Sequence, residues 1–444
     1  MNGGLSMVEM KSGYKMTEVG VIPEDWEVKE LGDITKDMSD GPFGSNLKSC
    51  HYTNNKEVRI IQLSNIGTDG WSDNNRKYTT YKHLDTIRRC EVKSGNLVIA
   101  KMMPAGRAII CPSTDAAYVL SSDAVRVNLL ECVNNEYAFY CTKSGYYLSQ
   151  IAEKTQGSTR ARTSIKKLRN ILFCMPNVKE QTAIATALSD VDSLISALTK
   201  KIEKKKAIKQ GLMQQLLTGK KRLPGYEKNR ESVQTEWGTI PKDWKTLSIG
   251  KCCSIKARIG WQGLKKSEYQ SSGEYVLVTG TDFLNGRIDW KSCVYVSKKR
   301  YEQDSNIQIV KHDILITKDG TIGKVAFLDD VPCLGTLNSG IFVVRSHSEE
   351  LDQSYLSKIF KSFIFDAFLE SLVAGSTINH LYQKDFVHFN FPVPPTISEQ
   401  TAIANILSDC DSEIAALEEK RDKYKEIKQG MMQQLLTGKI RLIK

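Results

Sequence analysis

One stretch of this chain occurs twice, and this duplication limits the possible folds more than any other feature. Residues 180–223 read EQTAIATALSDVDSLISALTKKIEKKKAIKQGLMQQLLTGKKRL, and residues 399–442 read EQTAIANILSDCDSEIAALEEKRDKYKEIKQGMMQQLLTGKIRL. About 31 of about 44 positions are identical, without gaps, at a shift of about 219 residues. The chain is therefore a tandem duplication, and we expect two similar halves related by pseudo-twofold symmetry.

The duplication continues upstream, more faintly. TEVGVIPEDW near the start matches TEWGTIPKDW in the middle of the chain. LVIAKMMPAGR at residues 97–107 aligns with ILITKDGTIGK at residues 314–324, which places Lys101 opposite Lys318. Both halves also carry a Gly-Ser-Thr tripeptide further along. The order of segments is thus the same in each half: a variable globular region, then a nearly identical long segment.

The two globular regions have the pattern of mixed α/β domains. Short apolar, β-branched runs such as GNLVIAK and DILITK are separated by Gly, Asp and Asn, which is typical of strands and turns. More helical stretches follow, YAFYCTKSGYYLSQIAEKT in the first half and QSYLSKIFKSFIFDAFLESLV in the second. A length of 444 residues also favours two or three domains. We therefore expect an α+β protein with two such domains.

The repeated segments have the pattern of long, paired helices. From Ile184, and again from Ile403, apolar residues recur at spacings that alternate between four and three, which is the seam of a coiled coil. Charged residues interrupt both seams beside Ile208 and Ile427, which predicts a local shift of the seam onto these isoleucines. We expect antiparallel pairing, because each helix leaves a different domain and must return. The predicted pairing residues are Ile184, Leu188, Val191, Ile195, Leu198, Ile202, Leu212, Leu216, Ile403, Leu407, Ile414, Leu417, Tyr424, Met431 and Leu435.

These patterns predict the domain boundaries. A Gly-Lys pair near the end of each helix is an expected helix stop. The expected segments are a disordered leader at 1–16, a first globular domain at 17–178, a spacer helix at 179–222, a linker at 223–234, a second globular domain at 235–397 and a second spacer helix at 398–444.

Composition narrows the class of protein only slightly. The net charge is +11, from 62 Lys+Arg against 51 Asp+Glu, which favours polyanions but is common elsewhere. The eleven cysteines are scattered, with no CxxC pair, so we expect no structural metal site and a reducing cytoplasm. No stretch reaches the roughly 18 apolar residues of a membrane span, and the first residues do not resemble a secretory signal.

Two unlike globular regions with two nearly identical long helices resemble the specificity subunit of type I restriction–modification systems. The resemblance covers residues 17–442 and is carried by several motifs in a fixed order. These are IPEDW and IPKDW, DGPFGSNLK at 40–48, KDGTIGK at 318–324, the Gly-Ser-Thr loops and the duplicated EQTAIA…LSD.

The resemblance implies a function and a division of labour. The globular regions would be target-recognition domains that each read half of a bipartite, asymmetric DNA site, and the helices would set the half-site spacing and dock two methyltransferase subunits. It also implies restriction and translocase subunits in a full complex, which would hold the S-adenosylmethionine, Mg²⁺ and ATP. This chain would carry no catalytic residue, no metal and no cofactor, which agrees with the lack of Asn-Pro-Pro-aromatic and Gly-x4-Gly-Lys-Ser/Thr motifs.

Comparison of the two halves suggests which residues contact DNA. Positions shared by both halves should hold phosphate or the fold, and positions that differ should read bases. The phosphate candidates, which could equally be solvated lysines or plain turns, are Lys101, Lys318, Ser158, Thr159, Ser376 and Thr377. The base-reading candidates are Asn46, Lys48, Asn65, Arg107, Arg160 and Arg162 in the first half, and Arg258, Trp261, Gln262, Lys265, Lys324, Asn379 and His380 in the second.

Other interpretations remain open from the sequence. The long helices could simply dimerise the protein or lie on its surface as amphipathic helices. The chain could be a fused nuclease or methyltransferase with an unrecognised centre, in which case the isolated chain would methylate or cleave DNA. It could also be a scaffold that holds two ligand-binding domains apart, in which case it would show no salt-dependent binding to duplex DNA.

Overall fold

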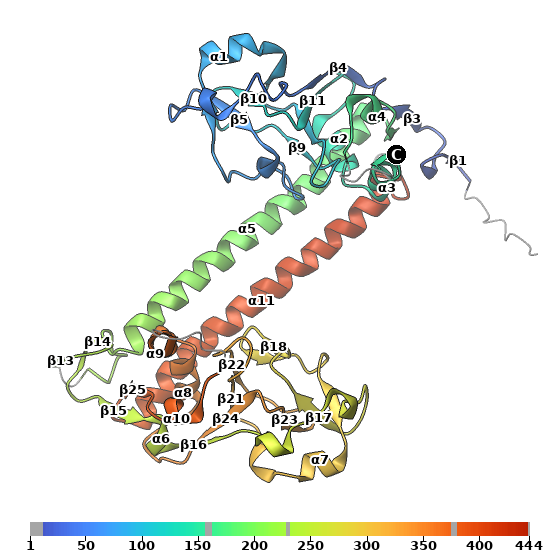
Figure 1. Cartoon of the computed structure of the whole chain (residues 1–444). Helices are drawn as coiled ribbons and strands as arrows, with labels where there is room; N and C mark the ends of the chain where they lie inside the picture. Colours follow the sequence, from blue (N-terminus) through green and yellow to red (C-terminus); the bar gives the residue numbers. More distant parts are fainter. Residues whose placement is uncertain (1–11, 156–161, 228–230, 374–379, 443–444) are drawn as a thin grey trace, which may run out of the picture. The chain divides into compact units, whose positions relative to one another are not determined.

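The computed structural model has two compact units, which we describe separately (Figure 1). It describes residues 12–155, 162–227, 231–373 and 380–442. Unit 1 comprises residues 1–199 with 419–444, and unit 2 comprises residues 200–418. Each unit therefore contains one globular region together with portions of both long helices.

The central sheet of unit 1 is antiparallel, with strand order β4-β11-β8-β9. Its strands are β4 (Thr35–Asp40), β8 (Leu97–Ala100), β9 (Ala108–Ile110) and β11 (Ala124–Leu129). Because successive side chains on a strand point to opposite faces, β8 serves two cores. Leu97 and Ile99 pack toward the helical side with Tyr137 and Tyr147, while Val98 and Ala100 pack against a second sheet. A continuous apolar run in the sequence thus marks a strand buried on both faces.

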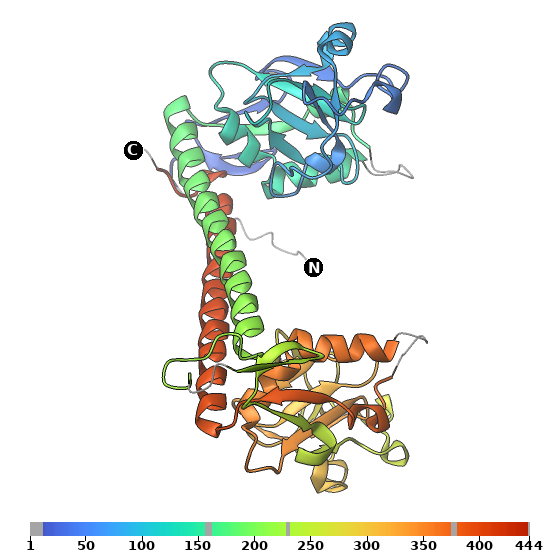
Figure 2. The ribbon, with the colours of Figure 1, turned by 90° about the vertical axis from the view of Figure 1, so that its left-hand side faces the viewer.

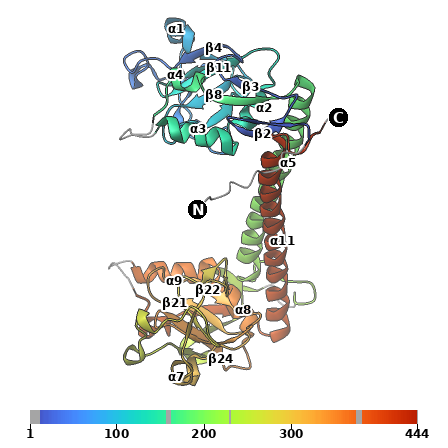
Figure 3. The same ribbon diagram turned by 90° about the vertical axis from the view of Figure 1, so that its right-hand side faces the viewer.

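The second sheet of unit 1 and three short helices cover the two faces of the central sheet (Figure 3). The second sheet has the order β6-β5-β10-β7, with β5 and β10 parallel. Its strands are β5 (Val58–Ile61), β6 (Tyr78–Thr79), β7 (Glu91–Val92) and β10 (Tyr118–Leu120). The helices are α2 (Asn135–Cys141), α3 (Gly145–Thr155) and α4 (Ile165–Arg169).

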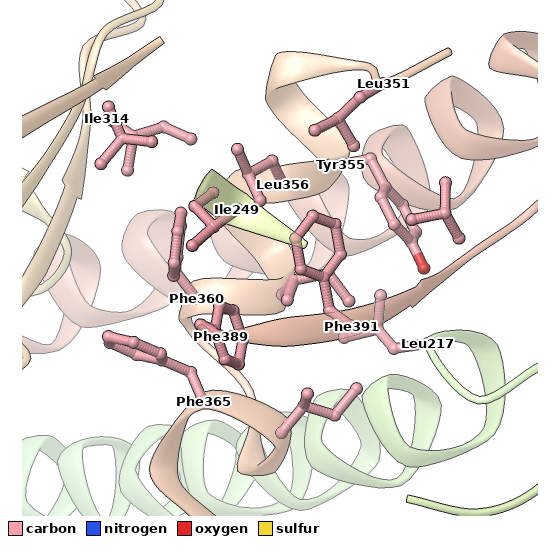
Figure 4. Packing of buried hydrophobic residues seen from close by; sticks show 14 of the residues in the cluster. Leu217, Ile249, Ile314, Leu351, Tyr355, Leu356, Phe360, Phe365, Phe389 and Phe391 are labelled. Atoms are coloured by element: carbon pink, nitrogen blue, oxygen red, sulfur yellow. The ribbon is translucent and has the colours of Figure 1, made fainter. Parts of the chain in front are cut away.

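Unit 2 repeats this arrangement. Its central antiparallel sheet has the order β16-β24-β21-β22, and its second sheet has the order β20-β17-β23. The strands are β16 (Cys253–Lys256), β17 (Tyr275–Val278), β20 (Val294–Val296), β21 (Ile314–Thr317), β22 (Val325–Phe327), β23 (Leu334–Leu337) and β24 (Ile341–Ser346). The helices are α8 (Gln353–Phe360), α9 (Phe363–Val373) and α10 (Gln383–Phe386). A cluster of aromatic side chains, including Phe360, Phe365, Phe389 and Phe391, fills the helical side of this sheet (Figure 4).

Short elements complete the units. In unit 1 they are β1 (Tyr14–Thr17), β2 (Gly20–Pro23), β3 (Glu27–Glu30), β12 (Leu172–Met175), α1 (Tyr81–Thr86), and the 3-10 turns η1 (Ser49–His51), η2 (Leu63–Asn65) and η3 (Arg88–Cys90). In unit 2 they are β13 (Ser232–Thr235), β14 (Gly238–Pro241), β15 (Lys245–Ser248), β18 (Phe283–Leu284), β19 (Arg287–Ile288), β25 (Asn390–Val393), α6 (Ile249–Cys252), α7 (Lys298–Glu302), η4 (Gly260–Gln262), η5 (Lys266–Glu268) and η6 (Ser305–Ile307).

The long helices are α5 (Val178–Leu216) and α11 (Ile397–Leu435), each of 39 residues. Within each unit the two helices run antiparallel. This is seen from the residues that bond across them: as residue numbers rise along α5, the numbers of their partners fall along α11. In unit 2, Lys205 bonds Glu413 at 2.7 Å and Lys209 bonds Asp411 at 2.5 Å. In unit 1, Lys428 bonds Asp192 at 2.6 Å, where the two helices lie side by side (Figure 2). The predicted α+β architecture with paired antiparallel helices is therefore confirmed.

The predicted pairing residues all face away from solvent to some degree. Those with buried side chains are Ile184, Leu188, Leu198, Ile202, Leu216, Ile403, Leu407, Ile414 and Leu435. Those partly buried are Val191, Ile195, Leu212, Leu417, Tyr424 and Met431. Many of these side chains at the helix ends do not pack in a helix–helix seam alone. They join the core of a globular region, with Trp26 in unit 1 and with Trp244 in unit 2.

The predicted shift of the seam onto Ile208 and Ile427 is wrong. These side chains are 46% and 41% exposed. The neighbouring lysines Lys209 and Lys428 stay partly buried instead, because each ammonium group reaches a carboxylate on the other helix. Long lysine side chains can lie along an apolar surface while their charge is neutralised, so the helices keep one register.

The predicted leader extends too far into the chain. Residues 1–11 lie outside the described residues, but β1 begins at Tyr14 and pairs with β2 in a hairpin. The expected helix stops at the Gly-Lys pairs lie a few residues beyond the ends of α5 and α11. Gly219 and Gly438 there adopt φ angles of 66° and 67°. A left-handed residue at this point ends a helix, and glycine adopts that conformation most easily.

Candidate nucleic-acid interface

Two loops leave the same edge of the central sheet in unit 1. One follows β4 and holds residues 41–48, and the other follows β8 and holds residues 101–107. They emerge side by side because β4 and β8 flank β11, with Asp40 opposite Val125 and Ala100 opposite Ala124. Together with Arg162, which pairs with Met102, we call these loops the tip of unit 1.

Lys101 is the residue that ties this tip together. Its ammonium group donates to an Asp40 carboxylate oxygen at 2.8 Å, and its side chain is only 10% exposed. Its backbone N–H donates to the carbonyl of Asp123, and its carbonyl accepts from Thr163. Arg162 in turn donates to Asp123 at 2.9 Å. The lysine charge is thus already neutralised inside the protein, which does not favour the predicted phosphate contact.

The tip of unit 2 is built on the same backbone. It comprises the loop after β16 at residues 257–265, the loop after β21 at residues 318–324, and His380. Lys318 donates its backbone N–H to the carbonyl of Gly340 and accepts from Leu381. Asp319 pairs with His380 both through the backbone and in a side-chain contact. The matched loop therefore keeps its hydrogen bonds while its side chains change.

The acid that neutralises the tip lysine occurs in unit 1 alone. In unit 2, Val343 lies opposite Lys256, and this register places Ala257 where unit 1 has Asp40. Among the described residues, Lys318 has no carboxylate within an ion-pair distance; its ammonium group lies 5.2 Å from the centre of the Phe342 ring. One tip thus offers an uncompensated cation at the position where the other offers an internal ion pair.

The other predicted residues of unit 1 divide by exposure. Asn46 and Lys48 are exposed in the loop after β4 and Arg162 is exposed beside the loop after β8, so all three are accessible to a ligand. Arg107 is partly buried, which lowers the pKa of its guanidinium. Asn65 is an incorrect choice. It is fully buried, and its amide bonds the carbonyls of Ser72 and Asn74, so it holds a loop together. The predicted residues outside the described part are Ser158, Thr159 and Arg160.

The predicted residues of unit 2 divide in the same way. Lys265 is exposed, and Lys324 and His380 are partly exposed. Arg258 and Gln262 are incorrect choices for base reading, because they are 2% and 5% exposed. Arg258 donates to the carbonyl of Leu337 at 2.8 Å, and burial, followed by the nearby Arg300, lowers its pKa. Ser376, Thr377, Asn379 and the side chain of Trp261 lie outside the described part of the chain.

The duplicated motifs meet in a clamp that sequence reasoning missed. In unit 1, Arg441 of the TGKIRL motif donates to Glu180 at 2.6 Å and to Asp25 at 2.7 Å. Glu180, from the EQTAIA motif, is fully buried and also accepts from the indole N–H of Trp26. The IPEDW, EQTAIA and TGK-x-RL motifs therefore meet in one contact. The sequence contained a signal for this contact, because all three motifs occur in both halves.

The same arginine–carboxylate clamp occurs in unit 2 with its own copies of the motifs, although the buried indole N–H of Trp244 has no hydrogen-bond partner among the described residues. Arg222 donates to Glu399 at 2.6 Å and to Asp243 at 2.7 Å. Burial alone would lower the pKa of Arg222, but the two carboxylates outweigh it and raise the pKa. A side chain at Gly219 would lie 2.5 Å from Pro241. The motifs shared by both halves are thus explained by the fold rather than by a ligand.

Two classes of site are not found in the part of the chain that the structure describes. No group of three or more His, Cys, Asp or Glu side chains there could hold a metal ion. None of the helices there is both long and apolar enough to cross a membrane.

Comparisons with known proteins agree on one family. A family model described as the type I restriction modification DNA specificity domain matches residues 23–210 and again residues 241–429. The type I restriction enzyme MjaVIII specificity subunit of Methanocaldococcus jannaschii is 27% identical, covering 95% of this chain and 94% of its own. The EcoKI specificity subunit of Escherichia coli is 22% identical over 46% of this chain and 44% of its own.

A solved structure has the same fold. The type I restriction–modification S subunit from M. genitalium aligns with a TM-score of 0.60 at 14% sequence identity, covering 92% of this chain and 96% of that one. The two family matches together span most of the chain and coincide with its two halves. The chain therefore belongs to the family of type I restriction modification DNA specificity domains, and it is a specificity subunit of a type I restriction–modification system with two target-recognition domains.

Proposed function

We propose that the tips of the two units each read one half of a bipartite, asymmetric DNA site. The observation that supports this most is the pair of matched tips, in which one backbone carries different side chains. At two matched positions, unit 1 has Lys101 and Asp40, whereas unit 2 has Lys318 and Ala257. Different side chains on a shared frame suit the reading of two different sequences, because base edges are distinguished by the donors, acceptors and apolar groups that meet them.

The long helices serve the same function mechanically in this proposal. They set the gap between the half-sites, since a stiff connection accepts only one separation. They also dock two methyltransferase subunits. Matched isoleucines on the two helices, Ile208 and Ile427, are exposed at 46% and 41% among charged neighbours, which suits contact with a partner.

Catalysis belongs to the partners in this proposal. Methyltransferase subunits would supply methyl transfer with S-adenosylmethionine, and restriction and translocase subunits would supply ATP- and Mg²⁺-dependent steps. This chain would act in the cytoplasm as the part that selects the DNA, without a cofactor of its own.

An exchange of one globular region tests the reading function. Residues 32–170 would be replaced by the corresponding segment of another specificity subunit, so that Asp25, Trp26, Glu180 and the β3–β12 pair keep the clamp intact. We expect long-read mapping of methylated bases to show a change in one half of the motif only. A change in both halves, or no change, would contradict the proposal.

Substitution of the exposed isoleucines tests docking. Ile208→Glu combined with Ile427→Glu should reduce co-purification of the methyltransferase subunits at least tenfold, because a charge would replace an apolar contact. The matched control is Ser193→Glu with Ser412→Glu, at exposed positions on the same two helices. Equal recovery of the partners with both pairs of variants would refute docking at these residues.

A further inference from the structure

Large apolar side chains stand at the tip of unit 1 where unit 2 has glycines. The aligned loops place Met103 opposite Gly320. The matched strand register, with Asp40 opposite Val125 in unit 1 and Lys256 opposite Val343 in unit 2, places Phe43 opposite Gly260. The difference therefore affects both loops of the tip and not one residue alone.

The backbone at Met103 has a conformation that glycine adopts more easily. Met103 has a φ of 60°, and Gly320 has a φ of 68°. For a residue with a side chain this left-handed region is strained, whereas for glycine it is not. Unit 2 has glycine at the corresponding point of its loop, so a positive φ there does not require methionine.

Both apolar side chains point into solvent. Phe43 is 76% exposed and Met103 is 66% exposed. A single exposed apolar side chain is ordinary on a protein surface. Here, however, the two side chains lie on adjacent loops that the Lys101–Asp40 ion pair holds together. The combination of exposure, strain and proximity distinguishes them from scattered surface residues.

Cationic residues occur on the same loops as this apolar pair and beside Phe43. The Arg89 guanidinium lies 5.7 Å from the centre of the Phe43 ring. Lys48 is exposed in the loop of Phe43, and Arg107 lies in the loop of Met103. An apolar centre with a basic rim suits duplex DNA, whose phosphates border the grooves that carry the bases.

We propose that Met103 and Phe43 contact the C5-methyl groups of thymines in the half-site read by unit 1. Thymine is the standard base that presents an apolar group in the major groove, so it is the base that an apolar side chain can distinguish there. The inference rests on the proposed function and adds the chemistry of one half-site. Unit 2 has Gly260 and Gly320 at the two matched positions and therefore lacks this pair of side chains, although Ile259 beside Gly260 is exposed.

Replacement of thymine by uracil tests the contact, because it removes the methyl group and leaves base pairing unchanged. The site and the half read by unit 1 are first established by methylation mapping and the exchange of residues 32–170. Full-length protein is then titrated with duplexes in which each thymine of that half-site is replaced in turn. We expect a loss of about fourfold in affinity per contacted methyl group.

Protein variants assign the loss to the two side chains. Met103→Gly and Phe43→Gly install the residues of unit 2, and Met103→Gly also relieves the backbone, so thermal stability should not fall. Each variant should bind the thymine duplex more weakly than the wild type does. Replacement of thymine by uracil should then weaken binding of the variant much less than it weakens binding of the wild type. Leu148→Ala is the control, since Leu148 is an exposed apolar residue of α3 in the same unit, at 51%.

The outcomes separate this inference from the proposed function. It is overturned if the half-site of unit 1 contains no thymine, if uracil does not weaken wild-type binding, or if both glycine variants keep the full uracil effect. It is also overturned if the variants weaken binding while the uracil effect stays the same, since Met103 and Phe43 would then contact something else. If the wild-type protein shows no specific binding to the mapped site, the proposed function itself is refuted instead.

Discussion

Units 1 and 2 share their clamp and differ at their tip. Each clamp joins an arginine, a buried glutamate and an aspartate, and in unit 1 the glutamate also accepts a hydrogen bond from Trp26. At the tips, Asp40 neutralises Lys101 in unit 1, whereas Ala257 stands at the matched position beside Lys318 in unit 2. Buried ion pairs tolerate little change, because each lost partner leaves a charge without compensation. Loops at a sheet edge tolerate more, so the two units diverge where a ligand can reach.

The largest effect should come from breaking a clamp. Arg222→Ala leaves Glu399, which is 1% exposed, without its partner, and should destabilise unit 2 by about 3 kcal/mol. Arg441→Ala should destabilise unit 1 by roughly half of that, since the Arg441 side chain is 29% exposed and water compensates part of the loss. Hydrogen exchange measured separately on the amides of each unit tests the difference.

A conservative variant controls for the loss of side-chain volume. Arg222→Lys keeps the charge but not the two-pronged contact with Glu399, so its effect should lie between wild type and Arg222→Ala. If Arg441→Ala accelerates exchange in unit 1 more than Arg222→Ala accelerates it in unit 2, burial of the ion pair does not determine how much each clamp stabilises its unit.

A smaller effect should come from the charge at the tips. Lys318→Ala should weaken binding to every DNA sequence on the order of tenfold and reduce the salt dependence by about one counterion, as expected for a phosphate contact. Ala257→Asp should reproduce part of this loss by supplying the acid that unit 1 already has. Asp40→Ala should do the opposite in unit 1 by freeing Lys101. Binding titrations at several salt concentrations measure all three variants.

Two results would break the comparison of the tips. Equal effects of Lys101→Ala and Lys318→Ala on the salt dependence would mean that Asp40 does not neutralise its lysine in solution. A loss confined to one base pair would mean that Lys318 reads a base instead of a phosphate.

The smallest effect concerns a matched pair of partly buried lysines. Burial lowers the pKa of both Lys143 and Lys361 to about 8. The ordinary pKa in an unfolded chain is about 10.4, so between the two values the unfolded state binds more protons and the free energy of unfolding rises with pH. Lys361→Met should therefore stabilise the protein at pH 7, by about 1 kcal/mol, and this gain should shrink toward pH 10.

Denaturant unfolding at pH 7, 8, 9 and 10 measures this difference for both units. Lys143→Met should behave with the same sign, since both ammonium groups donate to a backbone carbonyl, of Asp69 and of Gly286 respectively. A gain that grows with pH, or a loss at every pH, would mean that these hydrogen bonds outweigh the cost of burying the charge.

The recurring segments were the part of the fold that sequence reasoning predicted well. The spacing of apolar residues from Ile184 and from Ile403 predicted both helices and their pairing, because a 3.5-residue period leaves few alternatives. The antiparallel direction was predicted from the order of the segments, since each helix leaves a different domain and must return. The candidates Asn46 and Lys48 are indeed accessible. Asn65 and Arg258 were poor choices, because a polar residue between apolar runs has the same sequence signal whether it faces solvent or bonds the backbone inside.

By itself the sequence determined the duplication, the two mixed domains, the long helices and the family resemblance, since these follow from local periodicity and from self-similarity. Only the tertiary structure decided what the repeated motifs do. Arg441 meets Glu180 across 261 positions of chain, and Met103 and Phe43 share one tip because their strands flank a third. Such contacts depend on sheet order and on helix direction, which bring together side chains whose separation along the chain carries no signal of their proximity.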